Sequence, residues 1–337
     1  MTLRQIGRSV LFRIRRAGRA AGGIAATESD RIRRRKGRAD VALFHAFAPP
    51  PYGGGNQFLL ALKSELERRG LEVEVNRISG ATPACLVNSF NFDVRRLRRF
   101  KRPDCRLVHR VDGPIGVYRG FDDGTDARIA AINGELADAT IVQSRFSLEA
   151  HRSLEIELRD PVVVHNAVDP AIFYPPEHRE PVSERKVRLI ATSWSDNPNK
   201  GGETLAWLDR NLDRSRFELT LLGRFPVAFE HARVLEPLPS EAVAGELRRH
   251  DLYIAASRND PCSNALLEAL ACGLPAAFLD SGGHPELVGE AGLPFADDEE
   301  LVDVLARLVA EIEPRRSAIR VSSLADITDR YLEVLRG

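Results

Sequence analysis

The segment from residue 257 to residue 290 constrains the fold most, because strand, helix and strand signals follow one another in it without interruption. The apolar run 252–256 before it predicts a buried strand. The polar residues that come next offer side-chain oxygens and free backbone N–H groups at a helix start. Apolar side chains then recur at helical spacing: Leu266, Leu267, Leu270 and Ala271. Gly273 ends this helix, and residues 276–279 form the next strand before a second glycine loop, which together predict a phosphate-binding edge of a parallel sheet.

Two carboxylates are fixed in this segment, Asp260 before the helix and Glu268 within it. Helix geometry puts Asp260 at the mouth of the anion site and Glu268 about two turns along the helix. A carboxylate beside an anion site often accepts hydrogen bonds from sugar hydroxyls. For an isolated D-x7-E pattern, an N-cap Asp and a solvated helical Glu would be the simpler interpretation. The surrounding residues favour the functional one.

The string DPCSNALLEALACGLPAAFLDSGGHPELV, residues 260–288, resembles the signature of glycosyltransferase family 4, the retaining enzymes with the GT-B fold. In that family an E-x7-E pair is followed by a small-residue helix, a CGLP-like turn and a GG-x-PE loop. Asp260 stands here in the place of the first Glu. The resemblance implies that Asp260 contacts the donor sugar and Glu268 the ribose of the nucleotide. It also implies that backbone N–H groups at Ser263 and Asn264 stabilise a leaving diphosphate.

Composition argues against several other classes of protein. A chain of 337 residues is long enough for two domains of ordinary size. Its 48 basic and 48 acidic residues cancel, so overall charge does not indicate a nucleic-acid partner. No apolar run approaches membrane-spanning length. Four scattered cysteines lack the spacing of a zinc site or a disulfide framework and suit a reducing, cytoplasmic compartment: Cys85, Cys105, Cys262 and Cys272.

Residues 1–39 differ from the rest, because arginines alternate with apolar residues and a second basic cluster follows at 31–38. The apolar positions fall on one helical face, which predicts an amphipathic helix lying on an anionic membrane surface, at the inner face of the cell membrane. A solvated, partly disordered extension accounts for the same composition equally well. Arginines interrupt any apolar core, so this segment is not a signal peptide.

Residues 40–175 form the first predicted domain, on the acceptor side, in which short apolar strands alternate with helical stretches. The expected strands are residues 41–47, 73–78, 84–88, 106–111 and 140–143. This alternation predicts a parallel sheet covered on both faces. A Gly-rich loop precedes the expected helix 58–69, and Gly54 and Gly55 in it allow a ligand to approach the backbone closely. The resemblance implies that this loop faces the donor phosphate and the acceptor, although a glycine turn by itself is often only a turn.

The polar sequence HRVDGP, residues 109–114, ends one of these strands, where ligands bind in parallel sheets. Family 4 enzymes often have a histidine immediately before the aspartate of this loop, near the reacting sugar, and Val111 occupies that place here. Asp112 is therefore the predicted catalytic residue of the loop, and His109 is predicted to bind substrate. A turn that Asp112 caps at Gly113 is the competing interpretation.

After a polar linker at 176–185, residues 186–337 form the second predicted domain, which binds the nucleotide sugar and whose last helix crosses back to the first domain in the GT-B fold. The sequence SWSDNPNKGG follows its first strand and predicts another helix N-terminus aimed at an anion. Lys200 in this string would supply a positive charge for the diphosphate. Family members usually carry an arginine upstream of the Lys-Gly pair. That arginine is missing here, and Arg224 or Arg258 is expected to replace it.

The resemblance implies a retaining glycosyltransferase that moves a sugar from a nucleotide diphosphate sugar to an acceptor hydroxyl. The sequence has no D-x-D acid pair suited to a metal beside a diphosphate, so no metal or other cofactor is expected. The basic N-terminal segment favours a glycan or lipid-linked acceptor of the cell envelope or surface. Two alternatives stay open. One is a sugar-nucleotide epimerase of the same fold, which needs acid and base groups at the first-domain face. The other is a non-catalytic, membrane-associated scaffold with a degenerate site.

Overall fold

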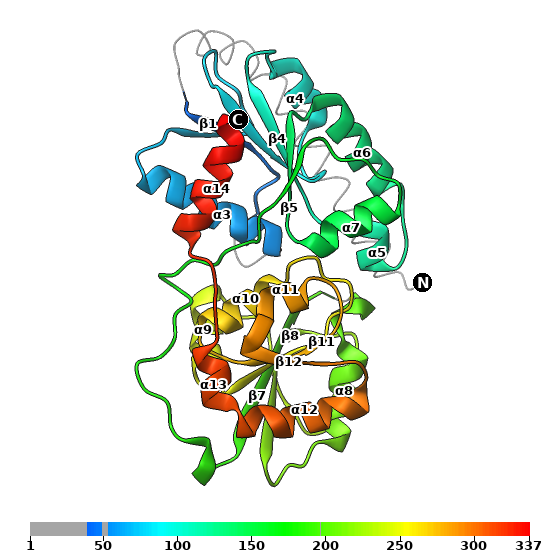
Figure 1. Ribbon diagram of the computed structural model, residues 1–337, viewed down its shortest axis with the longest axis vertical. Coiled ribbons are helices and arrows are strands. Elements are labelled where there is room, and N and C mark those ends of the chain that lie inside the picture. The colour runs from blue at the N-terminus through cyan, green and yellow to red at the C-terminus, as the bar shows by residue number, and fades with distance from the viewer. Residues whose placement is uncertain (1–38, 49–52, 196) are drawn as a thin grey trace.

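The computed structural model describes residues 39–48, 53–195 and 197–337. The predicted basic extension, except for Ala39, and the beginning of the Gly-rich loop at 49–52 lie outside the described residues. Two α/β domains are stacked along the long axis of the molecule, with the first domain at the top of Figure 1. Each domain contains one parallel six-stranded sheet, which confirms the predicted fold class of two Rossmann-like domains.

The first sheet has the strand order β2-β1-β3-β4-β5-β6, so the direction of winding reverses at β1. Its strands are β1 Val41–Phe44, β2 Val73–Val75, β3 Ala84–Asn88, β4 Arg106–Val111, β5 Ala139–Val142 and β6 Pro161–Val163. The accompanying helices are α3 Gly54–Arg68, α4 Val94–Phe100, α5 Ile115–Arg119, α6 Thr125–Leu136 and α7 Arg145–Ser153. Both β1 and β3 are buried along their whole length, as expected for central strands covered on both faces.

The first strand and the first helix differ from their expected limits. β1 ends at Phe44 rather than at residue 47, because the side chain of Asn76 takes over the backbone hydrogen bonds of His45. Asn76 Oδ1 accepts from the His45 N–H at 3.0 Å, and Asn76 Nδ2 donates to the His45 carbonyl at 2.7 Å. α3 begins at Gly54 rather than at residue 58, after Gly53 turns the chain with a φ of 73°.

The second sheet has the strand order β12-β11-β10-β7-β8-β9, and its winding reverses between β7 and β10. Its strands are β7 Val187–Trp194, β8 Phe217–Arg224, β9 Arg233–Leu235, β10 Leu252–Ala255, β11 Ala276–Leu279 and β12 Gly292–Phe295. The helices are α8 Gly202–Asn211, α9 Ser240–Arg248, α10 Asn264–Ala271, α11 His284–Val288, α12 Asp298–Ala310 and α13 Ile312–Ser317. Short 3₁₀ turns lie at η1 Val182–Glu184, η2 Pro198–Lys200 and η3 Gly289–Ala291.

The last helix, α14 Leu324–Arg336, packs against the first domain, as Figure 1 shows beside α3. The Tyr331 ring lies 5.5 Å from the Phe58 ring, and both belong to the buried core of the first domain. Two separate helices, α13 and α14, form the C-terminal part of the chain. Pro314 lies in the first turn of α13, where its missing N–H breaks no helical hydrogen bond, and a separate helix begins after Ser323 caps it.

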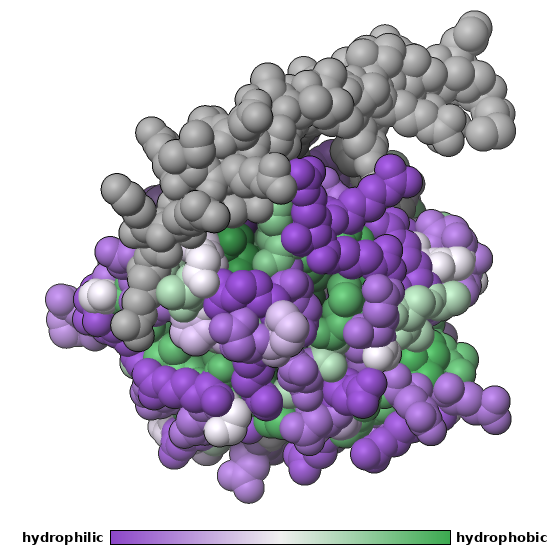
Figure 2. Space-filling view, turned by 90° about the horizontal axis from the view of Figure 1, so that it is seen from above, coloured by the Kyte–Doolittle hydropathy of each residue, from purple (hydrophilic) through white to green (hydrophobic). Residues whose placement is uncertain are grey.

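The described residues expose few large apolar side chains. Figure 2 shows the end face of the first domain as mostly hydrophilic, with separate hydrophobic areas between polar side chains. Across the described residues, the large apolar side chains that are exposed belong to distant segments: Val75, Phe121, Leu154, Tyr174 and Val234. None of the helices in the described part of the chain is both long and apolar enough to cross a membrane.

Candidate functional site

A cavity of about 380 Å³ is lined by both domains and lies at the carboxyl ends of their sheets. The winding of the second sheet reverses between β7 and β10, and the segments that follow these strands carry Lys200 and Asp260. Ligands of open α/β sheets bind at such a reversal point. Most of the predicted site residues line this one cavity: Gly54, Gly55, Asp112, Lys200, Asp260, Ser263, Asn264 and Glu268.

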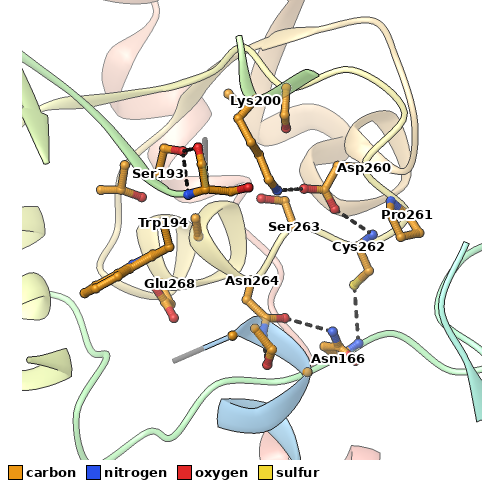
Figure 3. Close-up of a pocket in the computed structure, with 18 of the residues that line it drawn as sticks. Asn166, Ser193, Trp194, Lys200, Asp260, Pro261, Cys262, Ser263, Asn264 and Glu268 are labelled. Atoms are coloured by element: carbon orange, nitrogen blue, oxygen red, sulfur yellow. Dashed lines mark hydrogen bonds and ion pairs between the residues drawn. The ribbon is translucent and has the colours of Figure 1, made fainter. Parts of the chain in front are cut away.

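Lys200 and Asp260 form an ion pair within the cavity lining (Figure 3), with Lys200 Nζ 2.6 Å from Asp260 Oδ2. Burial is the largest influence on each group and favours its neutral form. The partner's opposite charge and hydrogen bond outweigh burial, so the pKa of Asp260 is lowered and the pKa of Lys200 is raised. Both groups are therefore charged at neutral pH, and the charge of Lys200 is already matched by a carboxylate.

The glycine loop after β11 fixes the backbone that carries Asp260. The Gly283 N–H donates to the Asp260 carbonyl at 2.9 Å. A Cβ added at Gly283 would lie 2.4 Å from the Pro261 carbonyl oxygen, a distance that real Cβ contacts do not reach. Gly282 has a φ of 67°, and its Cβ would lie 2.4 Å from the Asp260 carbonyl oxygen. The two glycines are needed because two backbone segments pack there without room for a side chain.

The first turn of α10 faces the cavity and connects the two domains. Ser263 caps the helix by accepting from the Leu266 N–H at 3.4 Å. The Asn264 side chain donates to the Gly54 carbonyl at 2.6 Å and accepts from Asn166 Nδ2 at 2.8 Å (Figure 3). A Cβ added at Gly54 would lie 3.0 Å from Asn264 Nδ2. Glycine at this position therefore lets the first-domain loop approach the start of α10.

Glu268 lies in the second turn of α10 and lines the cavity near Trp194 (Figure 3). Its side chain is half-buried, and loss of hydration raises its pKa to about 8. A substantial fraction of this carboxyl group is therefore protonated at neutral pH when no ligand is present. A carboxyl group in this state can both donate and accept hydrogen bonds with ligand hydroxyls.

Asp112 follows β4 and reaches the cavity from the first domain. Arg110 is fully buried beneath it, and its Nη1 donates to Asp112 Oδ1 at 2.9 Å and to Asn88 Oδ1 at 2.6 Å. The Gln143 side chain donates to the same oxygen of Asp112. These contacts hold the carboxylate in one orientation. The sequence gives no sign of this support, because burial of Arg110 depends on segments far from it along the chain.

His109 lies outside the cavity lining, so the structure does not bring it together with the other predicted site residues. The side chain is fully buried, its Nε2 lies 2.8 Å from the Ser89 carbonyl oxygen, and Asn133 Nδ2 lies 3.3 Å from its Nδ1. Burial is the main cause that lowers the pKa of His109 to about 4. Successive side chains of a strand point to opposite faces, and the contacts of His109 differ entirely from those of its neighbour Arg110.

Arg224 and Arg258 also lie outside the cavity lining, so the structure does not bring either of these expected cations to the other site residues. Arg224 ends β8, which is one strand beyond β7 and away from the reversal point, and its side chain is exposed. Arg258 is exposed as well, although its backbone N–H donates to the Asn199 carbonyl at 2.7 Å. Arg119, at the end of α5, lines the cavity from the first domain, and sequence reasoning did not identify it.

Within the ranges that the structure describes, no group of three or more His, Cys, Asp or Glu side chains is placed to bind a metal ion. The expectation that no metal is required stays a prediction. All four cysteines are buried and unpaired. Cys262 lines the cavity, and burial is the main cause that raises the pKa of its thiol to about 12, so it is not a thiolate nucleophile at neutral pH.

The family model described as Glycosyl transferases group 1 matches residues 208–311, within the second domain. A search of curated proteins finds no significant match. Among solved structures, sucrose-phosphate synthase from Thermosynechococcus elongatus has a TM-score of 0.70 at 16% identity, over 88% of this chain and 98% of that one. HepE from Anabaena in complex with UDP-glucose has a TM-score of 0.65 at 14% identity, over 88% and 98%.

A third similar structure is the catalytic domain of starch synthase IV from Arabidopsis thaliana bound to ADP and acarbose, with a TM-score of 0.64 at 10% identity, over 89% of this chain and 99% of that one. The chain therefore has the two-domain GT-B fold of these glycosyltransferases, and part of its second domain matches the group 1 glycosyl transferase model. The family match at 208–311 includes Asp260, Glu268 and the glycine loop that packs against the Asp260 backbone.

Proposed function

We propose that the protein is a family 4 glycosyltransferase, which moves a sugar from a nucleoside diphosphate sugar to an acceptor hydroxyl with retention of anomeric configuration. The observation that carries this proposal is the convergence of Lys200, the start of α10 and Glu268 on one interdomain cavity. A cation and a helix N-terminus suit a diphosphate, and a carboxyl group farther along the same helix suits sugar hydroxyls. Proteins of the same fold have been solved with UDP-glucose and with ADP.

In this reaction the bond between the anomeric carbon and a diphosphate oxygen breaks, and its electron pair stays on the diphosphate. The acceptor oxygen bonds to the same carbon from the face that the diphosphate leaves, and the acceptor proton passes to the diphosphate. Lys200 and the backbone N–H groups at Ser263 and Asn264 stabilise the negative charge of the leaving group. Stabilisation of developing charge is often the largest single contribution to catalysis.

The three acidic side chains of the cavity have separate roles in the proposal. Asp260 orients Lys200 through their ion pair and contacts the donor sugar from the second domain. Asp112 faces the cavity from the first domain, in an orientation that Arg110 fixes, and contacts the reacting sugar or the acceptor hydroxyl. Glu268 binds the ribose hydroxyls of the nucleotide. These contacts contribute to catalysis only when both domains surround the substrates and exclude water.

A thermal-shift screen tests the donor site directly. UDP, ADP and GDP and their sugar conjugates are added to the wild-type protein, to Lys200→Ala and Glu268→Ala, and to Glu149→Ala as a control on the exposed face of α7. A ligand that binds only the folded state raises the unfolding temperature as its concentration exceeds Kd. We expect a shift in the wild type and the control that shrinks in both site variants. No shift with any nucleotide would favour a scaffold without a donor site.

The stereochemical outcome needs its own measurement. Proton NMR of the product formed from an α-linked donor distinguishes an α-linked from a β-linked glycoside. We expect the anomeric configuration of the donor to persist in the product. A product of opposite configuration would overturn the retaining assignment and leave the donor specificity unaffected. Donor turnover to an isomeric sugar nucleotide without any acceptor would instead indicate an epimerase.

We also propose that the acceptor is a lipid-linked or cell-envelope glycan. The support is the alternation of arginines and apolar residues in 1–39, a composition that suits an anionic membrane surface. Sedimentation with vesicles of anionic lipid tests it, with neutral vesicles and a chain lacking residues 1–38 as controls. Binding that depends on both anionic lipid and the N-terminal residues is expected. Equal binding by the shortened chain would contradict the proposal.

A further inference from the structure

The cavity offers few cations for the diphosphate of the proposed reaction, because only two basic side chains line its described part. Its described lining contains three acidic side chains, Asp112, Asp260 and Glu268, and two basic ones, Lys200 and Arg119. The charge of Lys200 is matched by Asp260 at 2.6 Å. A leaving diphosphate therefore needs a further cation. The family resemblance would put it upstream of Lys200, where this chain has Ser193 and Trp194 instead.

Arg119 is the described lining residue that can meet this need. It is the last residue of α5 in the first domain, and its side chain is exposed while lining the cavity. Across the residues that the structure describes, its guanidinium group forms no hydrogen bond and no ion pair within 4 Å. An unpaired guanidinium group offers a planar set of donors that matches two phosphate oxygens at once.

The second domain holds the end of α5 beside Lys200. The carbonyl of Tyr118 accepts from Asn199 Nδ2 at 2.8 Å and from Asn197 Nδ2 at 3.3 Å. The ring of Tyr118 lies beneath Lys200, with Nζ 5.1 Å from the ring centre. These contacts fix the residue immediately before Arg119 against the segment that carries Lys200. The two cations therefore approach the same cavity from opposite domains.

A third asparagine completes this attachment from the Asp260 loop. Asn259 Nδ2 donates to the Val117 carbonyl at 3.3 Å. Asn259 has a φ of 54°, a left-handed conformation that asparagine tolerates better than most residues. Both loops at the reversal point of the second sheet are thus bonded to backbone carbonyls of α5. Separation of the domains would break all of these bonds and withdraw Arg119 from the cavity.

We infer that Arg119 is the second diphosphate-binding cation, supplied by the first domain in place of the arginine that similar enzymes carry in the second. This inference rests on the proposed function and goes beyond it in one respect. The charge that stabilises the leaving diphosphate is complete only when the two domains are together. Donor cleavage is then restricted to the closed enzyme, where an acceptor rather than water occupies the cavity.

The test compares nucleoside diphosphates with nucleosides. Binding of UDP, ADP and GDP, and of uridine, adenosine and guanosine, is measured by calorimetry with the wild type, Arg119→Ala and Arg119→Lys. Arg128→Ala is the matched control, because Arg128 is an exposed arginine of α6 in the same domain and does not line the cavity. Circular dichroism melts establish that each variant is folded.

Arg119→Ala is expected to weaken nucleoside diphosphate binding roughly 10-fold or more, as for loss of a charge-assisted hydrogen bond, and to leave nucleoside binding unchanged. Arg119→Lys should retain part of the affinity, and Arg128→Ala all of it. Equal diphosphate affinity in the wild type and Arg119→Ala would overturn the inference, as would equal losses in Arg119→Ala and Arg128→Ala. If the wild type binds no nucleoside diphosphate, the proposed function itself fails, which is a different result.

Discussion

The carboxylate of Glu286 accepts a hydrogen bond from the backbone N–H of Phe146 at 2.8 Å, although the two residues belong to different domains. The same carboxylate accepts from the Arg145 N–H at 2.9 Å and lies 3.3 Å from His165 Nε2. It therefore satisfies free N–H groups in the first turn of α7, where the positive end of the helix dipole favours an anion. Glu286 therefore connects the two domains in addition to the Asn264 contacts.

Removal of this connection should open the enzyme. Glu286→Ala leaves the α7 N–H groups without their carboxylate, a loss of about 0.5–2 kcal/mol by analogy with helix caps. We expect a larger radius of gyration for Glu286→Ala in small-angle scattering without ligand. Glu290→Ala, an exposed neighbour, serves as the control and should scatter like the wild type. An unchanged radius in Glu286→Ala would mean that other contacts alone keep the domains together.

Glu268 should make stability depend on pH. Burial raises its pKa from 4.5 to about 8, so between these values the unfolded chain has lost a proton that the folded chain retains. Rising pH therefore favours unfolding through this window. We expect the unfolding temperature of Glu268→Gln, relative to wild type, to rise as pH increases from 5 to 8. Parallel curves for the two proteins over that range would show that the carboxyl group ionises normally.

The ion pair of Lys200 and Asp260 predicts strong coupling between substitutions. Either Lys200→Met or Asp260→Asn alone leaves one charge in a mostly buried place without its partner. The double variant removes both charges. Its loss in free energy of unfolding should be smaller than the sum of the two single-variant losses by about 1–3 kcal/mol. Urea unfolding of the four proteins measures this coupling. Additive losses would indicate that solvent screens the pair.

Gly283→Ala should disturb Asp260 without touching a charged group. The new Cβ would lie 2.4 Å from the Pro261 carbonyl oxygen. Because this distance is too short for a real contact, the backbone of the loop has to move. We expect a loss of stability of about 1–3 kcal/mol together with weaker donor binding. Gly134→Ala is the control, because Gly134 lies within α6 with no atom within 4 Å of its added Cβ. Equal stability of the two variants would contradict the packing argument.

The second-domain half of the site could be predicted from the sequence because its parts are close together in the chain. Asp260 and Glu268 belong to one strand–helix unit, and their positions depend on turn and helix geometry that the local sequence specifies. The parallel sheets could be predicted for the same reason, since each βα unit is local. Whether each of these residues performs its proposed chemistry stays a prediction.

The first-domain half could not be predicted in the same way. The contacts of β4 side chains alternate along the strand: His109 contacts Ser89 and Asn133, whereas the next residue, Arg110, holds Asp112 of the site. Arg119 has no local feature that marks it as a binding residue. It reaches the cavity because asparagines about 80 residues later bond to the carbonyl of Tyr118. Such relationships exist only in the assembled pair of domains.

The packing of α14 against the first domain affects the order in which the domains fold during synthesis. Tyr331 and Leu335 fill the same buried cluster as Phe58 and Leu62, although more than two hundred residues separate them in the sequence. The hydrophobic interior of the first domain can therefore close only after α14 has been synthesised, and α14 follows all the strands of the second domain in the chain. The second domain, whose strands all precede α14, can fold earlier. The order of folding during synthesis is thus expected to run opposite to the order of the domains.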